Sequence, residues 1–192
     1  ANIIIDLKKD SVQFEGMLRL GKVYIDTYYQ VYGELSQSLS YDESIAYDLL
    51  GATQSFAPRT EINHQGTIDK ISNQGIRKVL NNYFQQEFEV EESFKEFNDI
   101  IITDSRPYLF RKGAIDISKV LHNNKYGFFP SQGGITNYEK LTKCYTDKVF
   151  VQLLSAMRIA MGRIVVTLEE LILKNSELIV TLNSEVDKNK VN

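Results

Sequence analysis

Two long segments without proline, one at each end of the chain, carry apolar residues in alternating steps of four and three. The three prolines are Pro58, Pro107 and Pro130, so residues 1–57 and 131–192 lack the strongest helix breaker. This spacing places the apolar residues along one side of an α-helix. We therefore predict a long helix near each end of the chain.

The first of these helices is predicted over residues 3–39. A second line of large residues, Met17, Tyr24 and Val31, widens its apolar face beyond that of a two-stranded coil, which favours packing against more than one partner helix. The main stripe comprises Leu7, Ser11, Phe14, Leu18, Gly21, Ile25, Tyr28, Tyr32, Leu35 and Leu39.

The second long helix is predicted from residue 147 to about 186. Thr146 and Asp147 supply its start signal, because a short oxygen-bearing side chain can accept from the free amides of a first turn. Only Asn175 is polar in its stripe. That stripe comprises Phe150, Leu154, Met157, Met161, Ile164, Leu168, Leu171, Asn175, Leu178 and Leu182.

Shorter helices are predicted between the two long ones. Ser40 and Glu43 have capping-box spacing and predict a short helix that ends near Gly51. Residues 60–72 predict a short or bent helix that Gly66 interrupts.

Asn73 can cap a further helix that runs to about Asp104, and Pro107 should kink or end it. No segment alternates with the period of two that a strand requires, so we expect little or no sheet. The sequence thus predicts an all-α fold in a single domain, 1–192. We expect an elongated helical bundle with its long N- and C-terminal helices antiparallel, shorter middle helices, and one long irregular connection at about 113–145.

Charge and residue spacing limit which partners and cofactors this chain is expected to bind. Lys and Arg number 22 against 25 Asp and Glu, a net charge of −3 with both signs interspersed, which argues against a nucleic-acid surface. Glu61 and His64 are three residues apart, the spacing of the Glu and His metal ligands that each of two helices supplies in di-iron bundles. A second such pair is missing, because the residue three before the other histidine, His122, is Lys119. We expect no metal and no other cofactor.

Nucleophilic catalysis is also not expected. Cys144 could act with His122 as base, but lone cysteines are more often inert buried residues. Gly133 and Gly134 lack the lysine and hydroxyl residue that complete a phosphate loop. The sequence therefore predicts no catalytic residue and no enzyme.

Six residues are the candidate sites for a ligand or partner. Tyrosines on the first helix offer aromatic surface with hydroxyls, although those on the stripe suit core packing and Tyr29 is the one expected at the surface. An arginine beside Pro107 could bind an anion, or could lie on a solvated or salt-bridged face. The candidates are Tyr24, Tyr28, Tyr29, Arg106, and two aromatics of the irregular connection, Tyr126 and Phe128.

A family resemblance covers most of the chain. Residues 60–84, TEINHQGTIDKISNQGIRKVLNNYF, resemble a pattern in uncharacterised single-pass bacterial membrane proteins: a small residue and glycine, an L-x-x-I step, then L-R-x-x-L-x-x-Y-Y. The opening IDLKKD resembles the segment that follows the membrane helix in that family. The residues in the pattern are Gly66, Ile68, Ile71, Ile76, Arg77, Leu80, Tyr83 and Phe84.

The resemblance implies a membrane helix that lies outside this chain and anchors it in the inner membrane, with a periplasmic helical domain of no known activity. Within the chain we expect neither a membrane-spanning run of about 20 apolar residues nor a signal peptide. The predicted function is non-enzymatic binding of a protein partner or small ligand. The alternatives are a periplasmic sensor domain of a signalling receptor and a cytoplasmic location, and heptad stripes also allow a homodimer.

Overall fold

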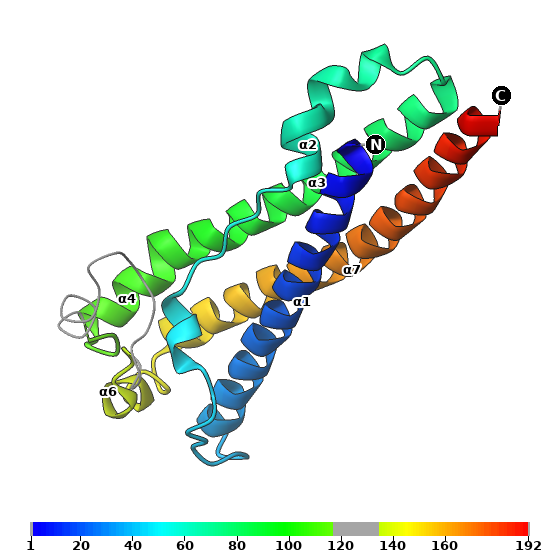
Figure 1. Cartoon of the computed structure of the whole chain (residues 1–192). Helices are drawn as coiled ribbons and strands as arrows, with labels where there is room; N and C mark the ends of the chain where they lie inside the picture. Colours follow the sequence, from blue (N-terminus) through cyan, green and yellow to red (C-terminus); the bar gives the residue numbers. More distant parts are fainter. Residues whose placement is uncertain (1, 117–134, 192) are drawn as a thin grey trace. The chain divides into compact units, whose positions relative to one another are not determined.

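The computed structural model describes residues 2–116 and 135–191 (Figure 1). The described residues form helices and turns without any strand, and one isolated bridge pairs Ile115 with Thr136. The all-α prediction is confirmed. In chain order the elements are α1 (Asn2–Leu35), the 3-10 helix η1 (Tyr47–Gly51), α2 (Arg59–His64), the 3-10 helix η2 (Gln65–Lys70), α3 (Gln74–Asp99), the π-helical η3 (Ile100–Ser105), α4 (Arg106–Arg111), α6 (Tyr138–Thr142) and α7 (Lys148–Val191).

The chain divides into two compact units, and α1, α3 and α7 each contribute residues to both. The start of α1 and the end of α7 belong to unit 1, whereas the end of α1 and the start of α7 belong to unit 2. The terminal helices therefore run antiparallel, as the sequence predicts. Unit 1 consists of Ala1–Gly21, Ser55–Phe94 and Arg163–Asn192, and unit 2 of Lys22–Gln54 and Lys95–Gly162.

The apolar stripe of α7 lies where the sequence predicts it. All ten residues of that stripe are buried, including the polar Asn175. The helix begins at Lys148, and the carboxylate of Asp147 accepts a hydrogen bond from the backbone N–H of Val149 at 2.9 Å. The start signal and the register of this helix are both confirmed.

The buried side of α1 combines parts of both predicted lines. Tyr24 and Val31 of the second line are buried, whereas Ile25 and Tyr32 of the main stripe are only half-buried. Asp10, which neither line includes, is also buried. A charged residue at a core position conceals this register from any search for apolar residues. The helix also ends at Leu35 rather than at residue 39.

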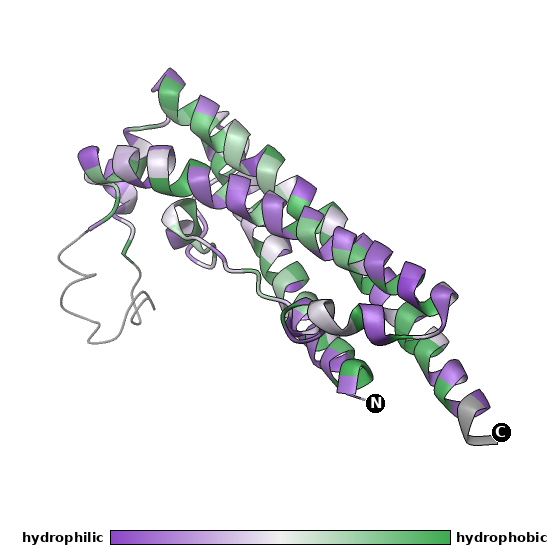
Figure 2. Ribbon diagram, turned by 90° about the horizontal axis from the view of Figure 1, so that it is seen from above, coloured by the Kyte–Doolittle hydropathy of each residue, from purple (hydrophilic) through white to green (hydrophobic). Residues whose placement is uncertain are grey.

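α7 is apolar on a second side. Ile159, Val166, Leu173 and Val180, seven residues apart, are all exposed, and Figure 2 shows hydrophobic and hydrophilic bands alternating along the helices. By length and composition, residues Lys148–Lys188 are apolar enough to cross a membrane, and 33% of their most apolar window is buried. The prediction that no segment has this character is wrong, but the core helix of a soluble protein can have the same length and composition.

The middle elements follow their predicted signals in part. The side chain of Asn73 accepts from the N–H of Ile76 at 3.2 Å, so it caps α3 as predicted, and the break at Gly66 lies within η2. Pro107 does not end the helix. The winding widens to a π-helix just before it, and Pro107 occupies the first turn of α4, where a missing N–H is tolerated.

The predicted capping box of Ser40 and Glu43 is wrong. Asp42 instead accepts from the backbone N–H and the hydroxyl of Ser44 at 2.9 and 2.7 Å. This local turn competes with helix formation, and only the short η1 follows.

Candidate functional site

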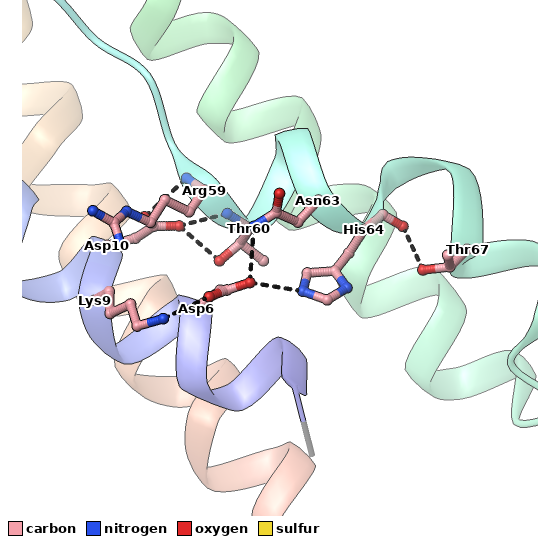
Figure 3. Close-up of polar contacts among 8 residues, drawn as sticks. All are labelled: Asp6, Lys9, Asp10, Arg59, Thr60, Asn63, His64 and Thr67. Carbon is pink, nitrogen blue, oxygen red and sulfur yellow. Dashed lines mark hydrogen bonds and ion pairs between the residues drawn. The ribbon is translucent and has the colours of Figure 1, made fainter.

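In unit 1 a buried carboxylate of α1 fixes the start of α2. Asp10 is fully buried and accepts from the backbone N–H groups of Arg59 and Thr60 at 2.9 and 2.7 Å, and from the Thr60 hydroxyl at 2.7 Å (Figure 3). The first amides of a helix have no partner within it. Asp10, which belongs to α1, therefore supplies the hydrogen-bond acceptors that the first amides of α2 lack within their own helix.

A second carboxylate of α1 holds the other end of α2. Asp6 accepts from the side-chain amide of Asn63 at 3.0 Å and lies 3.1 Å from Nε2 of His64 (Figure 3). These two contacts, with Lys9, hold the pKa of Asp6 below its ordinary value. His64 is thus engaged with α1, and no group of three His, Cys, Asp or Glu side chains among the described residues could hold a metal.

A third carboxyl group lies inside unit 1 and has no ion-pair partner among the described residues. Glu87 of α3 is fully buried, and neither of its carboxyl oxygens makes a hydrogen bond of regular geometry with another described residue. Burial raises its pKa to about 8, the nearby hydroxyl of Tyr83 lowers it, and the charges of Asp10 and Glu61 raise it. Glu87 is therefore mainly uncharged at neutral pH.

An open cleft of about 450 Å³ lies in unit 1, where α2 and η2 face α3. Its lining combines carboxylates, side-chain amides and aromatic rings, and Phe88 is 48% exposed. No lysine, arginine or histidine is among the described residues that line it. The lining residues are Glu61 of α2, Ile68 and Asp69 of η2, and Asn81, Phe84, Gln85 and Phe88 of α3.

The described lining of this cleft contains two carboxyl groups and no basic residue. Partial burial raises the pKa of Glu61, and the nearby charge of Glu91 raises it further. Among the side chains that the structure describes, no cation forms an ion pair with Glu61 or Asp69. The site can therefore favour a positive group.

A second cleft, of about 390 Å³, adjoins the first because Asp69 and Asn81 line both. Its other lining residues include Arg77 and Lys78 of α3. Negative charge thus predominates in the first cleft, and positive charge enters only in the second.

Two of the sequence-predicted residues lie together in the core of unit 2. Tyr24 and Tyr28 are buried with ring centroids 6.2 Å apart, and the Tyr24 hydroxyl donates to the carbonyl oxygen of Ala52 at 3.1 Å. The Tyr28 hydroxyl has no hydrogen-bond partner among the described residues, and burial raises its pKa well above the ordinary value. Both rings serve packing in this structure.

Of the other predicted residues, Arg106 lies near Tyr24: burial raises the pKa of the Tyr24 hydroxyl to about 12, and the charge of Arg106 acts to lower it. Tyr29 is 57% exposed and its ring faces the guanidinium of Arg158 at 5.9 Å, while Nε of Arg106 donates to the carbonyl oxygen of Gly51 at 2.9 Å. Tyr126 and Phe128 lie outside the described residues.

Unit 2 also contains a cluster of tyrosines around Glu34 that no sequence pattern predicts. The carboxylate of Glu34 accepts from the hydroxyls of Tyr138 and Tyr145 at 2.6 and 2.7 Å, from Gln30 at 2.9 Å, and from the Tyr47 hydroxyl. Burial alone would raise the pKa of Glu34, but these hydrogen bonds hold it below the ordinary value. These hydrogen bonds tie three segments of unit 2 together.

The sequence does hold a signal for Glu87, and a weaker one for the cleft. Seven buried positions of α3 and η3 alternate by three and four, and the only charged residue among them is Glu87: Leu80, Tyr83, Glu87, Val90, Phe94, Phe97 and Ile101. In the cleft, Asn81 with Gln85 and Phe84 with Phe88 are four apart, which gives α3 a mixed polar and aromatic side. Glu61 and Asp69 have no comparable spacing.

Comparisons with protein-family models, curated proteins and solved structures give no match to this chain.

Proposed function

We propose that this chain is a non-enzymatic binding domain that takes a protein partner or a small ligand in the cleft of unit 1. The supporting observation is that one open cleft combines a half-exposed aromatic ring at Phe88 with a carboxyl group at Glu61 that forms no ion pair with a described residue. Exposed aromatic rings next to orienting polar groups are typical of recognition sites.

A role in binding rather than catalysis also agrees with the state of Cys144. This thiol is buried, and burial raises its pKa, which keeps it in the unreactive thiol form. Its sulfur donates to the carbonyl oxygen of Lys140 at 3.6 Å.

The binding role can be tested with a small-molecule fragment screen observed by protein NMR. We expect fragments that bind to shift the side-chain amide signals of Asn81 and Gln85, and the substitution Phe88→Ala to weaken those shifts. The exposed Val79→Ala on the same helix, which does not line the cleft, serves as control. If the fragments that bind shift only signals elsewhere in the chain, the cleft is not the binding site.

For the setting of this domain we propose an inner-membrane anchor before residue 1, with the domain in the periplasm. The proposal rests on the resemblance of residues 60–84 to single-pass membrane proteins. Periplasmic and cytosolic reporters fused to the native full-length protein test it, and activity of the cytosolic fusion alone would contradict it.

A periplasmic sensor domain is the second candidate. Its supporting observation is that the first and last segments of the chain, Ala1–Gly21 and Arg163–Asn192, belong to the same unit. Two membrane helices, one before and one after the domain, could then leave from that unit. A run of about 20 apolar residues and a transmitter domain encoded after residue 192 would favour the sensor.

A further inference from the structure

The cleft of unit 1 has a composition that selects among ligands. We propose that it binds an organic cation, namely the guanidinium or ammonium group of a basic side chain on a peptide or protein partner. This inference rests on the proposed binding function and specifies the chemical class of the ligand.

The charge of the lining is the first argument. Glu61 and Asp69 bring two carboxylates to the cleft, and no basic residue is among the described residues that line it. Partial burial and, to a smaller extent, the nearby charge of Glu91 raise the pKa of Glu61. A bound cation offsets that repulsion, so its binding and the ionisation of Glu61 favour each other.

The aromatic and amide groups supply the second argument. Phe88 presents a half-exposed ring to the cleft, and Phe84 lies one helical turn before it on α3. A cation gains from contact with an aromatic face, and a guanidinium gains most because it is planar and weakly hydrated. The side-chain carbonyl oxygens of Asn81 and Gln85 can accept hydrogen bonds from the same group.

The size and the donor set favour an organic cation over a metal ion. The volume of about 450 Å³ lies in the range of small-ligand pockets. Among the described residues no three His, Cys, Asp or Glu side chains are grouped as a metal site. An open cleft with only two carboxylates and aromatic walls suits a large, weakly hydrated cation.

The second cleft adds a restriction. Arg77 and Lys78 line it beside Asp69, so a second positive charge next to the first would be repelled there. The pair of clefts therefore favours a single basic side chain with neutral or acidic neighbours over a polybasic run.

The experiment compares two peptides that differ in one group. Acetyl-Gly-Arg-Gly-amide and its citrulline counterpart have the same shape, but citrulline is uncharged. Each is titrated into the full chain at neutral pH and low salt, and the side-chain amide signals of Asn81 and Gln85 are followed by NMR. We expect the arginine peptide to bind about tenfold more tightly, the difference that one charge-assisted hydrogen bond supplies.

Substitutions locate the effect. Glu61→Gln together with Asp69→Asn should remove most of the preference for arginine over citrulline, and Phe88→Leu should weaken the arginine peptide. Glu177→Gln, which changes an exposed carboxylate of α7 outside the lining, should leave both affinities unchanged. Because these side chains are exposed or half-buried, the amide spectra of the variants should match the wild type and verify folding.

Each outcome bears on a different statement. Equal binding of the two peptides, or an unchanged preference in the Glu61→Gln and Asp69→Asn variant, overturns the cation inference and leaves binding at the cleft intact. Failure of the arginine peptide, when neutral fragments still shift Asn81 and Gln85, has the same meaning. If neither peptides nor fragments perturb the cleft, the proposed function falls as well.

Discussion

A carboxyl group can occupy a helical core position only if it is hydrogen-bonded, ion-paired or uncharged. Glu87 has no ion-pair partner among the described residues of unit 1, and Asp10 and Glu61 add like charge around it. Burying an unpaired charge costs far more free energy than binding the proton that neutralises it. Glu87 therefore remains protonated to a much higher pH than an exposed glutamate does.

Glu87 should make the stability of the chain fall as the pH rises. Its pKa is about 8 in the folded protein against an ordinary 4.5, so between these values the folded state holds one proton more than the unfolded state. The contribution of Glu87 is complete below pH 4.5 and is lost as the pH approaches 8. We expect the free energy of unfolding to drop by about 2 kcal/mol between pH 5.5 and 7.5, measured by urea unfolding.

Glu87→Gln isolates this effect because it removes the titration and keeps the shape. The variant should lose most of the pH dependence, and the difference from the wild type cancels other titrating groups such as His64. Glu89→Gln, exposed on the same helix, should behave like the wild type. An equal pH dependence in the Glu87→Gln variant would show that Glu87 is ionised throughout.

At the scale of elements, α2 is too short to form alone. A helix of six residues has no net gain from its own hydrogen bonds, because nucleation fixes several residues before the first bond forms. Its stability comes from Asp10 and Asp6 of α1, one at each end. The wall of the cleft that carries Glu61 thus depends on α1.

Asp10→Ala should loosen α2 specifically. It leaves two backbone N–H groups and the Thr60 hydroxyl without their acceptor, and we expect the free energy of unfolding to fall by about 1–3 kcal/mol. Amide hydrogen exchange of residues 59–64 should accelerate beyond that global change. Asp6→Ala, whose carboxylate is closer to solvent, should have the smaller effect, and unaltered exchange of α2 in the Asp10→Ala variant would contradict this account.

The registers of α7 and α1 illustrate what periodicity can and cannot predict. In α7 the ten stripe residues are nearly all apolar, so their spacing alone identifies the buried side. In α1 a core position holds Asp10, and the apolar pattern favours the wrong neighbour at Ser11. Polar core residues are stabilised by partners distant in sequence, and no local pattern contains those partners.

The cleft could not be predicted for a related reason. Phe88 continues the apolar pattern of α3, and only the packing of α2 and η2 against α3 leaves its ring half-exposed. Two of the tyrosines proposed as binding residues, Tyr24 and Tyr28, are instead buried in the core, because they lie on the apolar side of α1. Exposure depends on which elements meet, and helical periodicity describes each element separately.

At the scale of the molecule, the two units share their three longest helices. Such helices cannot lose their structure in one unit without fraying toward the other, because each hydrogen bond links residues four apart. We therefore expect the units to unfold together.

A pair of matched core substitutions tests this coupling. Leu171→Ala in unit 1 and Leu154→Ala in unit 2 remove equally buried side chains of α7, and each should cost about 2–5 kcal/mol. Hydrogen exchange should accelerate by similar factors in both units in either variant. Loss of protection confined to the substituted unit would mean that the units unfold independently.

The division of the chain also bears on its biosynthesis. Every residue of unit 2 has been translated once residue 162 is added, whereas unit 1 still lacks residues 163–192. The stripes of α1 and α3 in unit 1 must therefore emerge from the ribosome before the helix that covers them. Early segments with exposed apolar stripes are the kind that chaperones shield, so the nascent chain should need protection most while α7 is being made.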